Sequence, residues 1–137
     1  MALKHQYTVI CEQARIEMFG KFTLIGVTTG SIGLPQIPFS IPMLTFFNVL
    51  SIDTPGTHRF VGKITHLLTG KPVGQAQGVI QPPQAGPVVM PMQFGNLQFG
   101  AFDAYNFSLE FEGHEPFVTE FQVVHVPPPQ IQVIPRR

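Results

Sequence analysis

The segment from Tyr7 to Thr29 reads YTVICEQARIEMFGKFTLIGVTT. Two apolar runs flank a polar middle, and the sequence FGK at 19–21 marks a corner between them. Apolar and polar side chains alternate at the start of the first run, and glycine at a corner is typical of two strands joined by a turn. We therefore expect this segment to form two neighbouring strands that start the core of an antiparallel β protein.

The polar part of this segment, CEQARIEM at 11–18, also has the properties of a helix. Its residues are good helix formers, and Ile10, Ala14 and Met18 are spaced four apart, as on one helix face. The opening is β-branched, however, and alternates from Tyr7 to Glu12. These two features favour a strand with a bulged approach to the turn at Gly20.

Prolines determine the class of the rest of the chain. The 137 residues include fourteen prolines, and each proline inside a helix costs about 3 kcal/mol. Their distribution from Pro35 to Pro91 leaves no room for a long helix. The segment 30–42 (GSIGLPQIPFSIP) is expected to be an extended connection along a sheet edge.

Apolar runs separated by Gly, Pro and Asp turns predict the remaining strands at 41–50, 58–68, 73–80, 88–99, 105–112 and 117–126. The run at 41–50 is apolar on both faces, as in a central strand. The run at 73–80 has the composition of a weak or edge strand, and 88–99 that of an edge strand or a kinked pair. Spacings of 8–14 residues predict an all-β fold, an antiparallel Ig-like β-sandwich of about eight strands. A partly closed β-barrel is the alternative.

The sequence GAFDAYNF at 100–107 favours the sandwich over the barrel. In Ig-like sandwiches a tyrosine near the start of a late strand donates a hydrogen bond back to the preceding loop. Tyr105 occupies that position here, so we expect its hydroxyl to bond to the loop before it.

Length, charge and cysteine content limit the kinds of function. The length fits one domain, expected at 1–126, followed by a proline-rich C-terminal tail at 127–137. Eight basic and eight acidic residues give no net charge, so binding to nucleic acid or to a membrane is not expected. No signal peptide or transmembrane segment is apparent, which predicts a cytoplasmic protein. Cys11, the only cysteine, is expected to be a buried thiol.

Two motifs resemble a known family. The sequences CEQARIE at 11–17 and GKFTLIGV at 20–27 are similar to the opening of a bacterial family of small uncharacterised proteins. The later pattern of Gly100, Asn106-Phe107 and the Gly113 turn is similar to the second half of that family. The resemblance implies a β-sandwich of unknown function, and it brings no functional residues with it.

The sequence contains no pattern typical of a catalytic, metal or cofactor site, and we expect the protein not to be an enzyme. The five histidines lack partners at metal-ligand spacing, and the serines lack a nucleophile-elbow pattern. Glu110 and Glu112 lie on the same face of a predicted strand, where they are expected to be solvated. A hydrolase would require a cleft with a histidine and a carboxylate within about 3.2 Å of each other.

The remaining signals concern surfaces. We expect a non-catalytic protein-interaction or assembly module, which self-associates through a strand edge or binds another protein. The candidate contact residues are in an apolar edge segment and in the tail, namely Val89, Met90, Met92, Phe94, Ile131 and Val133. The alternative is a β-sandwich that binds a small molecule or a carbohydrate at a Phe-lined loop end.

Overall fold

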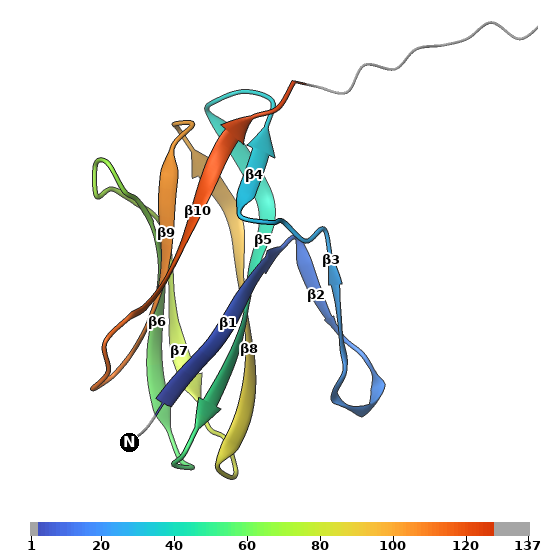
Figure 1. Cartoon of the computed structure of the whole chain (residues 1–137), viewed down its shortest axis with the longest axis vertical. Coiled ribbons are helices and arrows are strands. Elements are labelled where there is room, and N and C mark those ends of the chain that lie inside the picture. The colour runs from blue at the N-terminus through green and yellow to red at the C-terminus, as the bar shows by residue number, and fades with distance from the viewer. Residues whose placement is uncertain (1–2, 128–137) are drawn as a thin grey trace, which may run out of the picture.

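The computed structural model describes residues 3–127, and these residues form ten strands and one short 3-10 turn (Figure 1). In chain order the elements are β1 (Leu3–Cys11), β2 (Gln13–Ile16), η1 (Met18–Gly20), β3 (Phe22–Ile25), β4 (Ser31–Leu34), β5 (Phe39–Ile52), β6 (His58–His66), β7 (Pro72–Ile80), β8 (Gly86–Phe99), β9 (Ala104–Phe111) and β10 (Phe117–His125).

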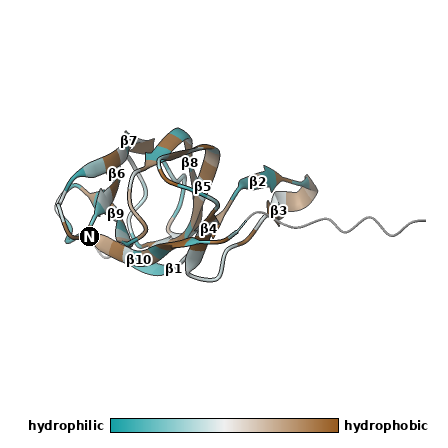
Figure 2. Ribbon diagram, turned by 90° about the horizontal axis from the view of Figure 1, so that it is seen from above, coloured by the Kyte–Doolittle hydropathy of each residue, from teal (hydrophilic) through white to brown (hydrophobic). Residues whose placement is uncertain are grey.

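The strands form two facing sheets and a separate hairpin. One sheet has the order β1-β5-β8, the second has the order β4-β10-β9-β6-β7, and β2 pairs with β3. All neighbours are antiparallel except β4 and β10. Figure 2 shows the two layers from above, with β7 beside β8 at one side. The all-β prediction is therefore confirmed, and the arrangement fits both the predicted sandwich and a partly closed barrel; the Ig-like topology stays a prediction.

Phe46 of β5 lies at the centre of the core. Its ring stacks on Phe107 with centroids 4.2 Å apart, and it meets the rings of Phe94 and Phe121 at 5.7 and 5.8 Å. The alternation predicted for β9 is confirmed, because its inward side chains are all buried: Tyr105, Phe107, Leu109 and Phe111. Aromatic rings from both sheets therefore contact one another across the core.

The strand predicted to be covered on both faces is β5, between β1 and β8. Residues 44–50 are buried without interruption. Phe46 points into the core, whereas Phe47 points to the outer face, where Phe22 of β3 covers it at a centroid distance of 5.1 Å. Phe22 of the β2–β3 hairpin therefore contributes to the second cover that an apolar central strand requires.

The prediction for the segment from Tyr7 to Thr29 needs a correction. Its residues do form strands rather than a helix, and β1 does join a core sheet. Residues 13–25, however, form a hairpin that projects from the body instead of starting the core (Figure 1). The physical reason is the polar middle, because Gln13, Arg15 and Glu17 would lose their hydration if both faces of the hairpin were covered.

Two further sequence predictions are confirmed. The hydroxyl of Tyr105 donates a 2.8 Å hydrogen bond to the carbonyl of Ala101, as expected for a tyrosine corner. The weak strands β7 and β8 each form the edge of their sheet. The segment 30–42, predicted to be a connection, instead contains β4 and the first residues of β5, although β4 does lie at a sheet edge. The division into a domain at 1–126 and a tail stays a prediction.

Candidate interaction surface

The structure places the four candidate residues of β8 in two different environments. Met90, Met92 and Phe94 point into the core and are buried, whereas Val89 points to the outer face and is 37% exposed. The sequence predicted all four side chains to lie on an accessible contact surface. That placement is corrected for Met90, Met92 and Phe94, because they are buried and not accessible to a partner. Ile131 and Val133 lie outside the described residues.

The reason for this burial lies on the facing sheet. Gly62 of β6 points at Met92, and a Cβ there would overlap the terminal methyl and sulfur of that methionine. Likewise, a Cβ on Gly74 of β7 would lie 2.6 Å from Leu97. The glycines on β6 and β7 thus leave space that large β8 side chains fill. The sequence of β8 alone does not show which positions of the facing sheet are glycine.

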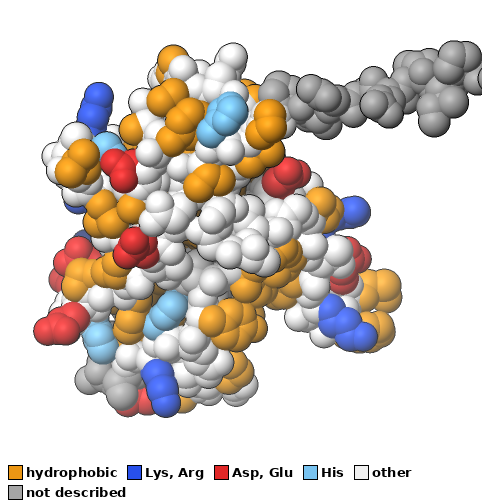
Figure 3. Space-filling view, turned by 45° about the horizontal axis from the view of Figure 1, so that its top comes forward, with side chains coloured by type: hydrophobic (Ala, Val, Ile, Leu, Met, Phe, Trp, Pro, Cys, Tyr) orange, Lys and Arg blue, Asp and Glu red, His pale blue; other side chains and the backbone are white. Residues whose placement is uncertain are grey.

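The hairpin exposes more apolar surface than β8 does. Ile16 is 78% exposed, Met18 is 74% exposed and Phe19 is 89% exposed. All three lie at the end of the hairpin that points away from the body, and Arg15 and Lys21 flank them. Figure 3 shows hydrophobic side chains next to charged ones on this projecting element. We call residues 15–21 the hairpin tip.

The backbone at the hairpin tip has an unusual conformation. Phe19 has φ 63° and ψ 32°, in the left-handed region, which is uncommon for any residue except glycine. Such a conformation costs on the order of 1–3 kcal/mol and persists where the surroundings impose it. Here this conformation directs the Phe19 side chain into solvent. No burial of that side chain within the described part of the chain offsets the cost of the conformation.

The hairpin is anchored to the body at both ends of its strands, because Phe22 pairs with Ile16 next to the hairpin tip and Glu12 precedes β2 at the base. Phe22 packs on Phe47, and the Thr45 hydroxyl donates a 3.2 Å hydrogen bond to the carbonyl of Glu12. On the other side of the hairpin, Thr28 N–H donates a 2.9 Å hydrogen bond to the carbonyl of Ile10. These contacts fix the direction of the hairpin, so the hairpin tip is presented in a defined position.

Sequence reasoning missed this surface because it assigned the segment to the core. The sequence signal for this exposed surface is the phase of the alternation between apolar and polar residues. Ile16, Met18 and Phe19 fit no single strand face together, since Phe19 breaks the alternation beside Gly20. A strand continued through this corner would place an aromatic side chain on the polar face.

A second feature is a chain of hydrogen bonds between Asp103, His66 and Thr69. Asp103 Oδ2 lies 3.0 Å from His66 Nε2, and His66 Nδ1 lies 2.9 Å from Thr69 Oγ1. Asp103 Oδ1 also accepts the Ala104 N–H at 2.8 Å. The Ala104 N–H, and then the bond from His66, hold the pKa of Asp103 below its usual value because both stabilise the carboxylate.

This chain of hydrogen bonds borders a cleft of about 560 Å³ at one end of the molecule, which we call the loop-end cleft. His66, Thr69, Lys71, Gln98 and Tyr105 contribute to its walls. The required pair of a histidine and a carboxylate is therefore present beside a cleft. Thr69 belongs to the turn after β6, however, and it also accepts the Lys71 N–H at 3.2 Å, so these bonds stabilise that turn and join it to the β8–β9 connection.

The part of the chain that the structure describes contains neither a metal-ion cluster nor a membrane-spanning helix. Within residues 3–127, no group of three or more His, Cys, Asp and Glu side chains lies close enough to hold a metal ion. In the same residues, no helix has the length and apolar character needed to cross a membrane. Cys11 is fully buried, as predicted, and burial raises the pKa of its thiol despite a hydrogen bond from the Gln13 backbone.

Comparison with known proteins determines the family. A family model described as a family of unknown function, DUF6941, matches residues 6–124. The chain belongs to this family. The predicted resemblance to a family of unknown function is thus confirmed at that level, whereas a bacterial origin and the specific opening motif stay predictions for DUF6941.

The other comparisons add little about activity. No curated protein matches the chain. Among solved structures, it is similar to a β-glucosidase from Erythrobacter marinus, with 11% identity and a TM-score of 0.49. The alignment covers 90% of this chain and 15% of the glucosidase chain. A similarity at this distance carries no argument about function.

Proposed function

We propose that this DUF6941 protein is a non-catalytic protein-interaction module that binds its partner with the β2–β3 hairpin. The observation that carries the proposal is Phe19, an almost fully exposed aromatic side chain on a left-handed backbone position at the hairpin tip. Burial of a phenylalanine side chain contributes about 1.5–3 kcal/mol. A partner that covers Phe19 together with Ile16 and Met18 would gain this energy from a pre-positioned element.

The hairpin also supports the expectation of contact through a strand edge. Within the described residues, β2 and β3 have only each other as strand partners. The outer edges of the hairpin therefore present backbone N–H and C=O groups that a strand of the partner can use. Apolar contacts at the hairpin tip and backbone hydrogen bonds along one edge can act together.

The non-catalytic part of the proposal is supported by the chemistry at the loop-end cleft. Both carboxylate oxygens of Asp103 take part in hydrogen bonds that shape the connection to β9. The Thr69 hydroxyl is likewise engaged by its own turn. These groups have structural tasks that account for their positions without a reaction.

Site-specific photo-crosslinking in cells that produce the protein tests the proposal. A benzophenone side chain replaces Phe19 in one variant and Leu68 in the control, because Leu68 is 81% exposed on the turn after β6. We expect discrete protein adducts from position 19 and not from position 68. Equal adducts from both positions, or none from position 19, would contradict the proposal.

A second candidate function rests on the loop-end cleft. Lys71 and Gln98 supply exposed polar groups at its walls, and Pro38, Pro72 and Val73 supply apolar ones, a combination suited to a small polar molecule such as a sugar. Titration with mono- and disaccharides tests this function. Amide NMR shifts confined to the cleft, and lost in a Lys71→Met/Gln98→Leu variant, would support it, and unchanged spectra would contradict it.

A further inference from the structure

The outer face of the five-stranded sheet carries a second cleft, of about 480 Å³, which we call the β6–β7–β9 cleft. Its lining residues are Arg59, Phe60, Val61, Gln77, Gly78, Val79, Glu110 and Glu112. Val79 is 53% exposed, so apolar surface is accessible there. The carboxylates of Glu110 and Glu112 are exposed, and neither forms an ion pair within the described residues.

The hairpin tip has chemistry complementary to this cleft. Its three exposed apolar side chains match the valines of the cleft, and the cations of Arg15 and Lys21 match the two carboxylates. The hairpin tip also has one anion, Glu17, and the cleft one cation, Arg59. The hairpin tip therefore has two cations and one anion, and the cleft has two anions and one cation. Charge complementarity of this type selects and orients a partner.

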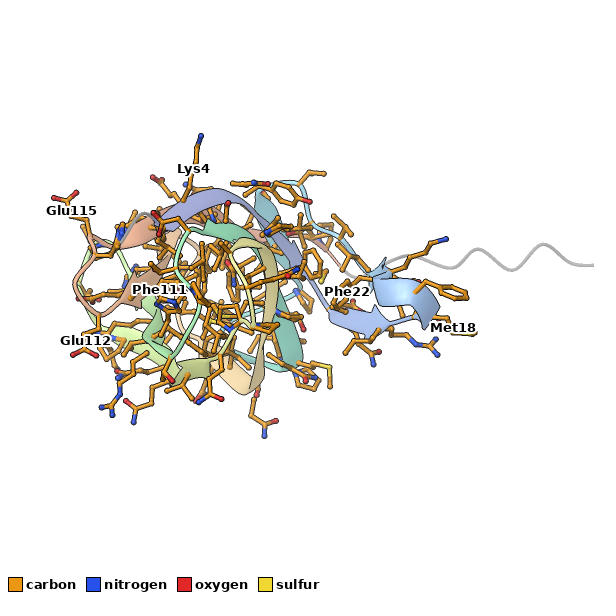
Figure 4. All side chains as sticks on the ribbon, turned by 90° about the horizontal axis from the view of Figure 1, so that it is seen from below. Lys4, Met18, Phe22, Phe111, Glu112 and Glu115 are labelled. Atoms are coloured by element: carbon orange, nitrogen blue, oxygen red, sulfur yellow. The ribbon has the colours of Figure 1, made fainter. Side chains whose placement is uncertain are left out.

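The two surfaces lie on opposite sides of the molecule. In Figures 1 and 2 the β2–β3 hairpin projects from one side, and β6, β7 and β9 form the other. Figure 4 shows the same separation for Met18 of the hairpin tip and Glu112 of the cleft. A hairpin anchored to β5 through Phe22 and Glu12 cannot reach the cleft of its own chain. Two copies also cannot exchange hairpins symmetrically, because that requires both surfaces on one face.

We propose that the hairpin tip of one copy docks into the β6–β7–β9 cleft of a second copy, so that copies join head to tail. This inference rests on the proposed function and names the partner. A head-to-tail contact leaves one free hairpin and one free cleft at the ends of an open chain, and it grows into longer chains or closes into a ring. The hairpin tip has far fewer residues than the roughly 20–30 that each side contributes to a standard interface, so we expect the association to be weak and to depend on concentration.

Sedimentation velocity of the wild-type protein and three variants tests this inference. Phe19→Gly removes the central apolar group of the hairpin tip at a position whose backbone suits glycine. Glu110→Lys/Glu112→Lys reverses the charge of the cleft, and Glu115→Lys/Glu120→Lys makes the same change at positions outside the cleft. Thermal unfolding of each variant verifies that it is folded.

We expect the wild-type protein and the Glu115→Lys/Glu120→Lys control to increase in mean mass with concentration, without stopping at a dimer. Phe19→Gly and Glu110→Lys/Glu112→Lys should each remain monomeric. An equal mixture of these two variants should form a one-to-one dimer and nothing larger, because only one intact hairpin tip and one intact cleft remain per pair.

Three outcomes would overturn the inference: a wild-type monomer at every concentration, association that survives either variant, or a mixture that stays monomeric. The crosslinking experiment distinguishes failure of the head-to-tail inference from failure of the proposed interaction function. Adducts that join position 19 to a different protein would support the proposed interaction function and contradict self-association. Adducts between two copies agree with the head-to-tail contact.

Discussion

Thr8 of β1 donates a 2.7 Å hydrogen bond from its hydroxyl to Oδ1 of Asn48, a fully buried side chain of β5. The amide of Asn48 in turn donates to the carbonyls of Phe46 and Met90, at 3.0 and 3.1 Å. One polar network therefore joins all three strands of the smaller sheet. Its members are satisfied, which is the condition under which a buried amide is tolerated.

Replacement of Thr8 by valine removes the donor but keeps the shape of the side chain. Asn48 Oδ1 is then buried without a partner, so we expect a loss of about 1–3 kcal/mol in the free energy of unfolding. Chemical denaturation measures this loss. Thr23→Val on the exposed face of the hairpin is the matched control and should change stability by less than about 0.5 kcal/mol. Equal effects of both variants would show that the network is not important for stability.

His5 makes the stability of the protein depend on pH. Its Nε2 lies 2.7 Å from Thr8 Oγ1, and burial holds the pKa of His5 below its ordinary value of 6.5. The unfolded chain therefore binds a proton more readily, and stability falls as the pH drops below about 6.5. In His5→Gln, an amide replaces the ring as the hydrogen-bonding group, and we expect this part of the pH dependence to disappear. Denaturation curves between pH 7.5 and about 5 measure the difference.

The tyrosine corner fixes the connection between β8 and β9. Tyr105→Phe leaves the Ala101 carbonyl without its donor and keeps the ring packing against Phe99 and Phe121. We expect a loss of about 1–2 kcal/mol in the free energy of unfolding, measured by chemical denaturation. Tyr7→Phe is the control, because Tyr7 is 51% exposed and should have a negligible effect.

Two phenylalanines should respond very differently to truncation. Phe46→Ala leaves a void among stacked rings and should cost about 3–5 kcal/mol. At Phe19, substitution by glycine relieves a left-handed strain on the order of 1–3 kcal/mol, and the added freedom of the unfolded chain costs about 0.5–1 kcal/mol, so we expect no loss of stability or a small gain. A large loss of stability in Phe19→Gly would place Phe19 in the fold rather than at a binding surface.

The thiol of Cys11 should be unreactive in the folded protein. It is fully buried, and its raised pKa further lowers the fraction of thiolate near neutral pH. We expect modification by a disulfide reagent to be at least ~100-fold slower than in the unfolded chain. Thr23→Cys in a Cys11→Ala background gives an exposed thiol for comparison, and similar rates for the two thiols would contradict the burial of Cys11.

The sequence by itself determined the class of the fold and its local corners. The prolines from Pro35 to Pro91 excluded long helices there, strict alternation predicted the inward face of β9, and the position of Tyr105 predicted the corner at its start. These features are local, since each depends on backbone dihedrals or on a period of two along one strand.

Only the tertiary structure decided which apolar side chains remain exposed. Met92 and Phe94 have the composition of a contact surface, but glycines on β6 and β7 leave space for them in the core. Ile16 and Phe19 have the composition of a core, but no sheet within the described residues faces the end of their hairpin. Burial depends on what the opposite layer provides at that position, and a strand's own sequence does not contain that information.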